Sequence, residues 1–296
     1  MDAACIVAVG DSITQGAVPH KSWRYWLWRE LLDAGVTFTW AGSTIRRLDE
    51  QEDEELLRYG NLTFPARHEG HWGWRADQIL EEIPTWAIGY QCQPSCALVH
   101  LGTNDMWQGD DLASTVDEVL RVPEVLRRLG NPNMTVLLAV PIPSCTERVS
   151  TELAPRIRAL GDDGPGRRFL VHQDVGFSNV SMTYDGCHPN ELGEQAMAAR
   201  WRDAVLEHCV NVTLAVGVQL PPPMPHVQPP SPPALPPGSI VAVAAAATLA
   251  LGVVVACAVR WRRRRRRRLE KHTTRRQKST EAELSPMQAS NTVNDQ

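Results

Sequence analysis

The chain has 296 residues and a formal net charge of −4, but the charge divides between two regions of opposite sign. Residues 1–238 carry 18 basic against 30 acidic residues, a net charge of −12, whereas residues 260–296 carry 12 against 4, a net charge of +8. An acidic domain lacks the basic face that a phosphate backbone requires, so the sequence argues against a nucleic-acid partner. About 215 residues precede a proline-rich stretch, enough for one α/β domain with a sizeable core.

The first predicted element is a buried strand that runs from Ala4 to Val9, a short apolar stretch rich in β-branched residues. The residues from Gly10 to Thr14 break this run and form a turn that exposes Ser12. Ligands of open α/β sheets bind beyond the carboxyl ends of the strands, so Ser12 is a candidate for chemistry. An ordinary turn serine is the alternative, and motifs later in the chain must decide between the two.

Strands and helices then alternate along the chain. We predict strands over residues 36–41, 97–101, 135–140 and 169–172, and helices over residues 22–34, 75–83, 112–129 and 146–160. A last helix starts with Asn190 as its N-cap and ends near Cys209. This order predicts an α/β fold of three layers, α/β/α, with a five-stranded parallel sheet like that of flavodoxin. The acidic excursion at residues 46–58 is predicted to be a solvated loop.

The carboxyl-terminal part has a different composition. Ten of the 17 residues from Pro221 to Pro237 are proline, which predicts an extended spacer of roughly 50 Å or a ligand for a proline-recognition domain. The twenty uncharged residues from Ile240 to Val259 are long enough to cross a bilayer as a helix. Seven arginines follow, from Arg262 to Arg268, and we expect them on the cytosolic side beside anionic lipid headgroups. The predicted organisation is therefore a folded domain at residues 1–219, a linker at 220–238, a transmembrane helix at 239–260 and a basic, disordered tail at 261–296.

Two features favour an extracellular or luminal location for the folded domain. Six cysteines precede the predicted span, an even number that is compatible with disulfides. Four glycosylation sequons also precede it and none follows it; their acceptors are Asn61, Asn133, Asn179 and Asn211. No signal peptide is visible before the first strand, so either the true start lies upstream, which we favour, or the span itself directs insertion.

Three further segments supply polar groups that could work with Ser12. A hydroxyl nucleophile needs a base, a group that orients the base, and donors for the oxyanion. Asp185 lies three residues before His188 in a turn just ahead of the last helix, and Asn104 follows the predicted strand at 97–101. A backbone N–H of Gly70 or Gly73 could be exposed before the helix at 75–83. Candidates for every role therefore fall on loops after predicted strands.

These segments resemble, in order, the four sequence blocks of the SGNH, or GDSL-type, hydrolase superfamily. The blocks begin with Gly-Asp-Ser at residues 10–12, Gly73, Gly-Thr-Asn-Asp at 102–105 and Asp-Gly-Cys-His at 185–188, and the resemblance extends from residue 4 to about residue 209. The resemblance implies an SGNH hydrolase fold and a serine esterase in which Ser12 is the nucleophile, His188 the general base and later the acid, and Asp185 its orienting group. It assigns the oxyanion hole to the N–H groups of Ser12 and Gly73 and the amide of Asn104. It requires no cofactor and no metal.

Residues 68–74 further resemble the acetylxylan esterases of carbohydrate esterase family 3, which usually have serine where this chain has Trp72. This implies a carbohydrate substrate from which acetyl or another short acyl group is removed. Three alternatives remain: a lipid or lysophospholipid esterase, a sugar O-acyltransferase, and a non-catalytic surface module that binds carbohydrate. The intact serine, aspartate and histidine argue against the third.

Several other residues are candidates for a role. Trp72, Trp74 and Trp107 form either a sugar-stacking rim or ordinary packing. His68 and His71 lack the spacing of a zinc helix and a nearby third ligand, so we expect no metal there. The cysteines suggest a bridge between Cys145 and Cys187 at neighbouring strand ends and a local pair of Cys92 with Cys96.

Overall fold

Parallel strands with apolar sequences form the centre of the molecule. The computed structural model describes residues 4–50 and 57–210, and within them the strand order is β2 (Phe38–Ala41), β1 (Ala4–Gly10), β6 (Cys96–His100), β7 (Thr135–Val140) and β8 (Arg168–His172). All four pairings along this path are parallel, as expected. A two-residue strand that the sequence did not indicate, β5 (Glu69–Gly70), also pairs with β1, beside Val9 and Gly10. It lies along the end of β1 that leads into Ser12.

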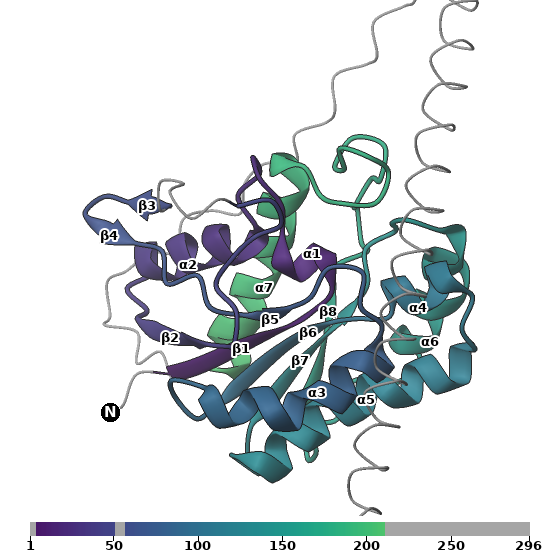
Figure 1. Cartoon of the computed structure of the whole chain (residues 1–296), viewed down its shortest axis with the longest axis horizontal. Helices are drawn as coiled ribbons and strands as arrows, with labels where there is room; N and C mark the ends of the chain where they lie inside the picture. Colours follow the sequence, from purple (N-terminus) through teal and green to yellow (C-terminus); the bar gives the residue numbers. More distant parts are fainter. Residues whose placement is uncertain (1–3, 51–56, 211–296) are drawn as a thin grey trace, which may run out of the picture. The chain divides into compact units, whose positions relative to one another are not determined.

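Two pairs of helices cover the sheet (Figure 1). Helices α2 (Trp23–Asp33) and α7 (Glu191–His208) pack together on one face, and α3 (Ala76–Trp86) and α5 (Leu112–Leu129) pack together on the other. Successive side chains of a strand point to opposite faces, so Ile6 contributes to the core under α2 and α7 while Val7 contributes to the core on the other side. Both faces of the strands are buried, which explains their almost continuous apolar sequences.

The segment expected to form one helix over residues 146–160 is divided. Its first part is a π-helical turn, η2 (Val149–Leu153), and its second is the short helix α6 (Ala154–Arg158). Pro155 lies at the junction and has no N–H to continue a regular α-helical ladder. The segment is therefore helical from Val149 to Arg158, as predicted, although it is not one regular α-helix.

The shortest elements were not predicted, because two to six residues are too few to show a period. They are α1 (Ser12–Gln15), η1 (Ala87–Gly89), α4 (Thr103–Gln108) and the hairpin of β3 (Arg58–Tyr59) and β4 (Leu62–Thr63). The loop prediction for residues 46–58 also needs correction. Arg47 is buried, its guanidinium is 3.0 Å from Glu50 and it donates to the His20 carbonyl, so this part of the excursion is not solvated.

Disulfides join Cys5 to Cys92, Cys96 to Cys209, and Cys145 to Cys187. The expected local pair of Cys92 with Cys96 is therefore wrong. Cys96, at the start of β6, is buried in the core under α2 and α7, whereas Cys92 packs against the core on the opposite face of the sheet. Four residues apart in sequence, the two side chains are separated by the sheet itself.

Across residues 4–50 and 57–210, no helix has both the length and the apolar character needed to cross a bilayer. The span predicted from Ile240 to Val259 lies outside the described residues, as do the proline-rich linker, the arginine block and Asn211.

Candidate active site

Ser12 lies just after β1, at the start of the short helix α1. β1 ends at Gly10, Asp11 is the N-cap of α1, and its carboxylate accepts a hydrogen bond of 2.9 Å from the N–H of Ile13. A Cβ atom on Gly10 would lie within 3 Å of the Thr14 side chain and the His100 carbonyl, so only glycine fits this turn. The turn places the Ser12 backbone N–H at the start of a helix, with its side chain at the carboxyl edge of the sheet.

The structure brings Ser12, His188 and Asp185 into one hydrogen-bonded chain. Nε2 of His188 lies 3.0 Å from Oγ of Ser12, and Nδ1 of His188 lies 2.7 Å from Oδ2 of Asp185. With the proton on Nδ1 donated to Asp185, Nε2 is free to accept the Ser12 proton. This is the arrangement that a serine nucleophile and its general base require.

Hydrogen bonds stabilise the ionised form of Asp185. Its second oxygen, Oδ1, accepts from the backbone N–H of His188 at 2.7 Å and of Cys187 at 3.0 Å. Burial alone would raise the pKa of Asp185, but these backbone bonds and the His188 side chain outweigh it, so the pKa lies below its ordinary value. The carboxylate therefore remains charged wherever His188 acts as a base.

Two anchors hold the loop that carries Asp185 and His188. Asn190, two residues after His188, caps α7 by accepting from the N–H groups of Leu192 and Gly193. The Cys145–Cys187 disulfide ties the loop to the segment after β7, and the Cys145 N–H also donates to the Gly186 carbonyl at 3.1 Å. The loop with Asp185 and His188 is thus tied both to α7 and to the segment after β7.

The three expected oxyanion donors come from three segments that are tied together. Gly73 has a φ of +79°, and no atom lies within 4 Å of the position that a Cβ would take. Glycine is therefore favoured here by the backbone conformation and not by lack of space. The Asn104 amide donates to the Trp74 carbonyl at 2.9 Å, and that of Gln108 donates to the Gly73 carbonyl at 3.3 Å; both come from α4. Within the described residues, the N–H groups of Ser12 and Gly73 have no protein acceptor. They remain available to a developing oxyanion.

The loop at residues 71–74 is also hydrogen-bonded to the two elements that flank Ser12, β1 and α1. The Trp72 N–H donates to Oε1 of Gln15 in α1 at 2.8 Å, and the His71 N–H donates to the Gly10 carbonyl at 3.0 Å. Sequence reasoning missed Gln15, because a single glutamine on a four-residue helix carries no recognisable pattern.

The two histidines of this region serve the loop. Nδ1 of His68 accepts from the Gly70 N–H at 2.9 Å, and burial pushes the His68 pKa well below its usual value, so the ring is neutral. Nε2 of His71 lies 2.9 Å from the buried carboxylate of Glu69, whose oxygens also accept from the N–H and hydroxyl of Ser43. These bonds engage Nδ1 of His68 and Nε2 of His71 within the protein itself.

The three tryptophans have different surroundings. The Trp72 indole stacks on the His188 imidazole, with ring centroids 4.3 Å apart. Trp74 packs against Trp86 and the core under α3, which favours packing over a sugar-binding role. Trp107 lies on α4 with 63% of its surface exposed.

Two buried carboxyl groups, those of Asp11 and Asp105, are sequence neighbours of the expected oxyanion donors Ser12 and Asn104. Burial raises the pKa of Asp11 to about 7, and the nearby charge of Asp105 adds to this shift. Burial also raises the pKa of Asp105 to about 7, although the hydrogen bond from the Ala76 N–H at the start of α3 opposes the shift. Asp11 caps α1, which begins at Ser12, and Asp105 accepts from the first N–H of α3, three residues after Gly73.

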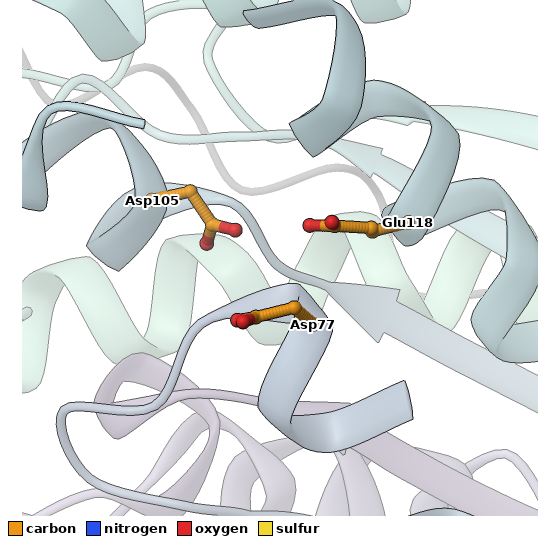
Figure 2. A group of neighbouring side chains, drawn as sticks. All are labelled: Asp77, Asp105 and Glu118. Atoms are coloured by element: carbon orange, nitrogen blue, oxygen red, sulfur yellow. The ribbon is translucent and has the colours of Figure 1, made fainter. Parts of the chain in front are cut away.

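Asp105 also belongs to a group of three acids, with Asp77 on α3 and Glu118 on α5, whose side chains point toward one another in Figure 2. One oxygen from each lies within 4.8 Å of the others, a separation that a cation could bridge. The group already has protein partners, because Asp105 caps α3 and Asp77 pairs with Arg75 at 2.6 Å.

The same sequence blocks lie within a match to a known protein family. The GDSL-like Lipase/Acylhydrolase family matches residues 8–196, which include Ser12, Gly73, Asn104, Asp185 and His188. No curated protein matches the chain.

Solved structures share the fold. A carbohydrate esterase of family 3 from Talaromyces cellulolyticus is 23% identical with a TM-score of 0.58, and the match covers 69% of this chain and 97% of that one. A family 3 carbohydrate esterase from Clostridium thermocellum is also 23% identical, with a TM-score of 0.52 over 70% of this chain and 96% of its own. A serine-to-alanine variant of an acetyl esterase with an acetate ion has the same identity and a TM-score of 0.56, over 69% of this chain and 97% of that one. At this identity, the likeness shows a common fold.

Proposed function

This chain belongs to the GDSL-like lipase/acylhydrolase family and is a carboxylic ester hydrolase, and we propose that it removes short acyl groups, acetyl above all, from carbohydrate by a Ser-His-Asp mechanism. The observation that carries the mechanism is the chain of hydrogen bonds from Ser12 through His188 to Asp185, at 3.0 and 2.7 Å.

The first half-reaction forms an acyl-enzyme. Oγ of Ser12 attacks the ester carbonyl while Nε2 of His188 takes its proton, and the carbonyl oxygen becomes an oxyanion. The N–H groups of Ser12 and Gly73 and the Asn104 amide stabilise this charge. The bond to the alcohol then breaks, His188 returns the proton to the departing oxygen, and Asp185 stabilises the imidazolium throughout.

The second half-reaction regenerates the enzyme. A water molecule attacks the acyl group, His188 accepts its proton, and the carboxylic acid leaves as Ser12 recovers the proton. If a sugar hydroxyl took the place of water, the same residues would transfer the acyl group instead.

The carbohydrate substrate is supported by the resemblance of residues 68–74 to acetylxylan esterases. Related structures are described as family 3 carbohydrate esterases and as an acetyl esterase, which agrees with this choice for a chain of the same fold. This chain departs from those esterases at Trp72, whose ring stacks on His188.

We further propose that the domain faces the outside of a cell or a lumen, anchored by the predicted helix from Ile240 to Val259. All six cysteines of the described residues are in disulfides, which persist in oxidising compartments. The three described sequon asparagines, Asn61, Asn133 and Asn179, are all exposed. Loss of mass on treatment with an N-glycosidase would support this location, and cytosolic recovery of the protein with free thiols would contradict it.

The first experiment is hydrolysis of an aryl acetate and an aryl octanoate by the full chain, with Ser12→Ala and Ser114→Ala as test and control variants. Ser114 is exposed at the start of α5, so its loss should leave the rate unchanged. Acetate hydrolysis that disappears only in Ser12→Ala supports the proposal, and a preference for octanoate would favour a lipid substrate. Acyl transfer to added sugar without hydrolysis would identify a transferase, and activity retained by Ser12→Ala would overturn the mechanism.

A further inference from the structure

The catalytic imidazole lies beside two nearly parallel aromatic rings. The Trp72 ring centroid is 4.3 Å from that of His188 at an interplanar angle of 20°, and the Tyr184 centroid is 5.7 Å away at 19°. Tyr184 in turn stacks on His20 at 4.7 Å. The base therefore contacts ring faces as well as its hydrogen-bonding partners.

We propose that Trp72 is a positioning residue for His188, and this inference rests on the proposed function. A flat ring against the imidazole limits rotation about the bond that carries the ring, so Nε2 stays aligned with Ser12 while Nδ1 stays aligned with Asp185. The electron-rich face of an indole also attracts a cation, and His188 carries a positive charge whenever it holds the serine proton. The stack thus stabilises the protonated form that exists only during the reaction.

Trp72 itself is held by the serine side of the site. The backbone N–H of Trp72 donates to Oε1 of Gln15 at 2.8 Å, and the Gln15 side-chain amide donates to the Arg46 carbonyl at 3.2 Å. The next residue is Gly73, a proposed oxyanion donor. One short segment therefore presents a donor to the carbonyl oxygen and a ring to the base, so the two are positioned together.

Packing does not explain the side chain. Trp72 is only partly buried and contributes to neither hydrophobic core, whereas Trp74, two residues later, packs against Trp86 and the core under α3. Removing the Trp72 ring should therefore leave the fold intact. A contact with the leaving alcohol is the competing role, and it differs in its kinetics because it would change KM.

The test uses Trp72→Ala and Trp72→Phe in the full chain, with Phe169→Ala as the matched control. Phe169 stacks on His208, which has no part in the site, with ring centroids 3.8 Å apart. With an aryl acetate we expect kcat of Trp72→Ala to fall about 3- to 30-fold with little change in KM, the range given by a cation–π contact. Trp72→Phe should recover most of this loss, and Phe169→Ala should keep the kcat of the parent protein.

Nuclear magnetic resonance of the His188 ring protons tests the stack without reference to activity. The indole ring current holds these protons upfield, so their signals should move downfield in Trp72→Ala and stay in place in Phe169→Ala. Unmoved signals, or an unchanged kcat, would overturn the proposal, and a rise in KM alone would make Trp72 a substrate contact instead. If no ester is hydrolysed by the parent protein, the proposed function fails, while the resonance shift still reports whether Trp72 stacks on His188.

Discussion

The side-chain amide of Asn104 donates to the backbone carbonyl of Trp74 at 2.9 Å, so one proposed oxyanion donor holds the loop that presents another. The amide has a second N–H, which is left for the substrate oxygen. Because α4 and the loop at residues 71–74 are bound to each other, the geometry of the oxyanion hole depends on Asn104 in two ways.

Asn104→Ala should therefore lower kcat far more than it changes KM. Loss of one donor typically costs about 2.7 to 4 kcal/mol of transition-state stabilisation, or about 10²- to 10³-fold in rate. Asn104→Asp, which keeps the shape but cannot donate, should be impaired at least as strongly. Steady-state kinetics on an aryl acetate provide the measurement, with Asn131→Ala in an outlying turn as control; an unchanged kcat would remove Asn104 from the mechanism.

Asp185→Asn should reduce kcat by about 10³- to 10⁴-fold, because an amide cannot fix the Nδ1–H tautomer of the base or stabilise its charge. The variant should remain folded, since its oxygen can still accept from the N–H groups of Cys187 and His188. Circular dichroism and kinetics on the same sample provide the check, with the exposed Asp203→Asn as control. A loss of less than tenfold would mean that Asp185 does not orient the base.

Peptide mapping without reduction should recover three bridges, Cys5–Cys92, Cys96–Cys209 and Cys145–Cys187.

Replacing both Cys145 and Cys187 by serine should lower kcat, because their bridge anchors the loop that carries the proposed base. The free energy of unfolding should fall by about 3 to 4 kcal/mol. The matched variant, Cys5→Ser with Cys92→Ser, should lose comparable stability but keep its kcat. Equal kcat losses in both double variants, or a free thiol at Cys187, would contradict this assignment.

The buried Asp11 predicts an unusual pH dependence of stability. Its pKa is raised from 3.8 to about 7, so the folded state binds this proton more tightly than the unfolded state does. The group's contribution to stability is present below about pH 4 and is lost as the pH rises to about 7. Asp11→Asn stays neutral and can still accept from the Ile13 N–H.

We therefore expect Asp11→Asn to raise the free energy of unfolding at pH 8, relative to its effect at pH 4, by roughly 4 kcal/mol. Urea titrations at the two pH values measure this difference. Asp117→Asn serves as control, since its carboxylate is largely exposed beside Arg121. A pH dependence equal to that of the parent protein would show that Asp11 is ionised in the folded state across this range.

The order of the long elements and the residues of the proposed catalytic chain can both be read from the sequence. The prediction for residues 135–140 and that for residues 112–129 match β7 and α5, because each apolar pattern extends over enough residues to show a period. Ser12, Asp185 and His188 were identified because their motifs are local, and because parallel strands bring the loops after them to one edge of the sheet.

Which distant side chains meet depends on the packing of the whole domain. Cys92 and Cys96 are near in sequence but lie on opposite faces of the sheet, so each pairs with a cysteine more than 80 residues away. The stack of Trp72 on His188 joins residues 116 positions apart through two independent loops, and no local pattern encodes it. Short-range patterns are set by backbone geometry, whereas these contacts depend on how the packed sheet and helices place their connecting loops.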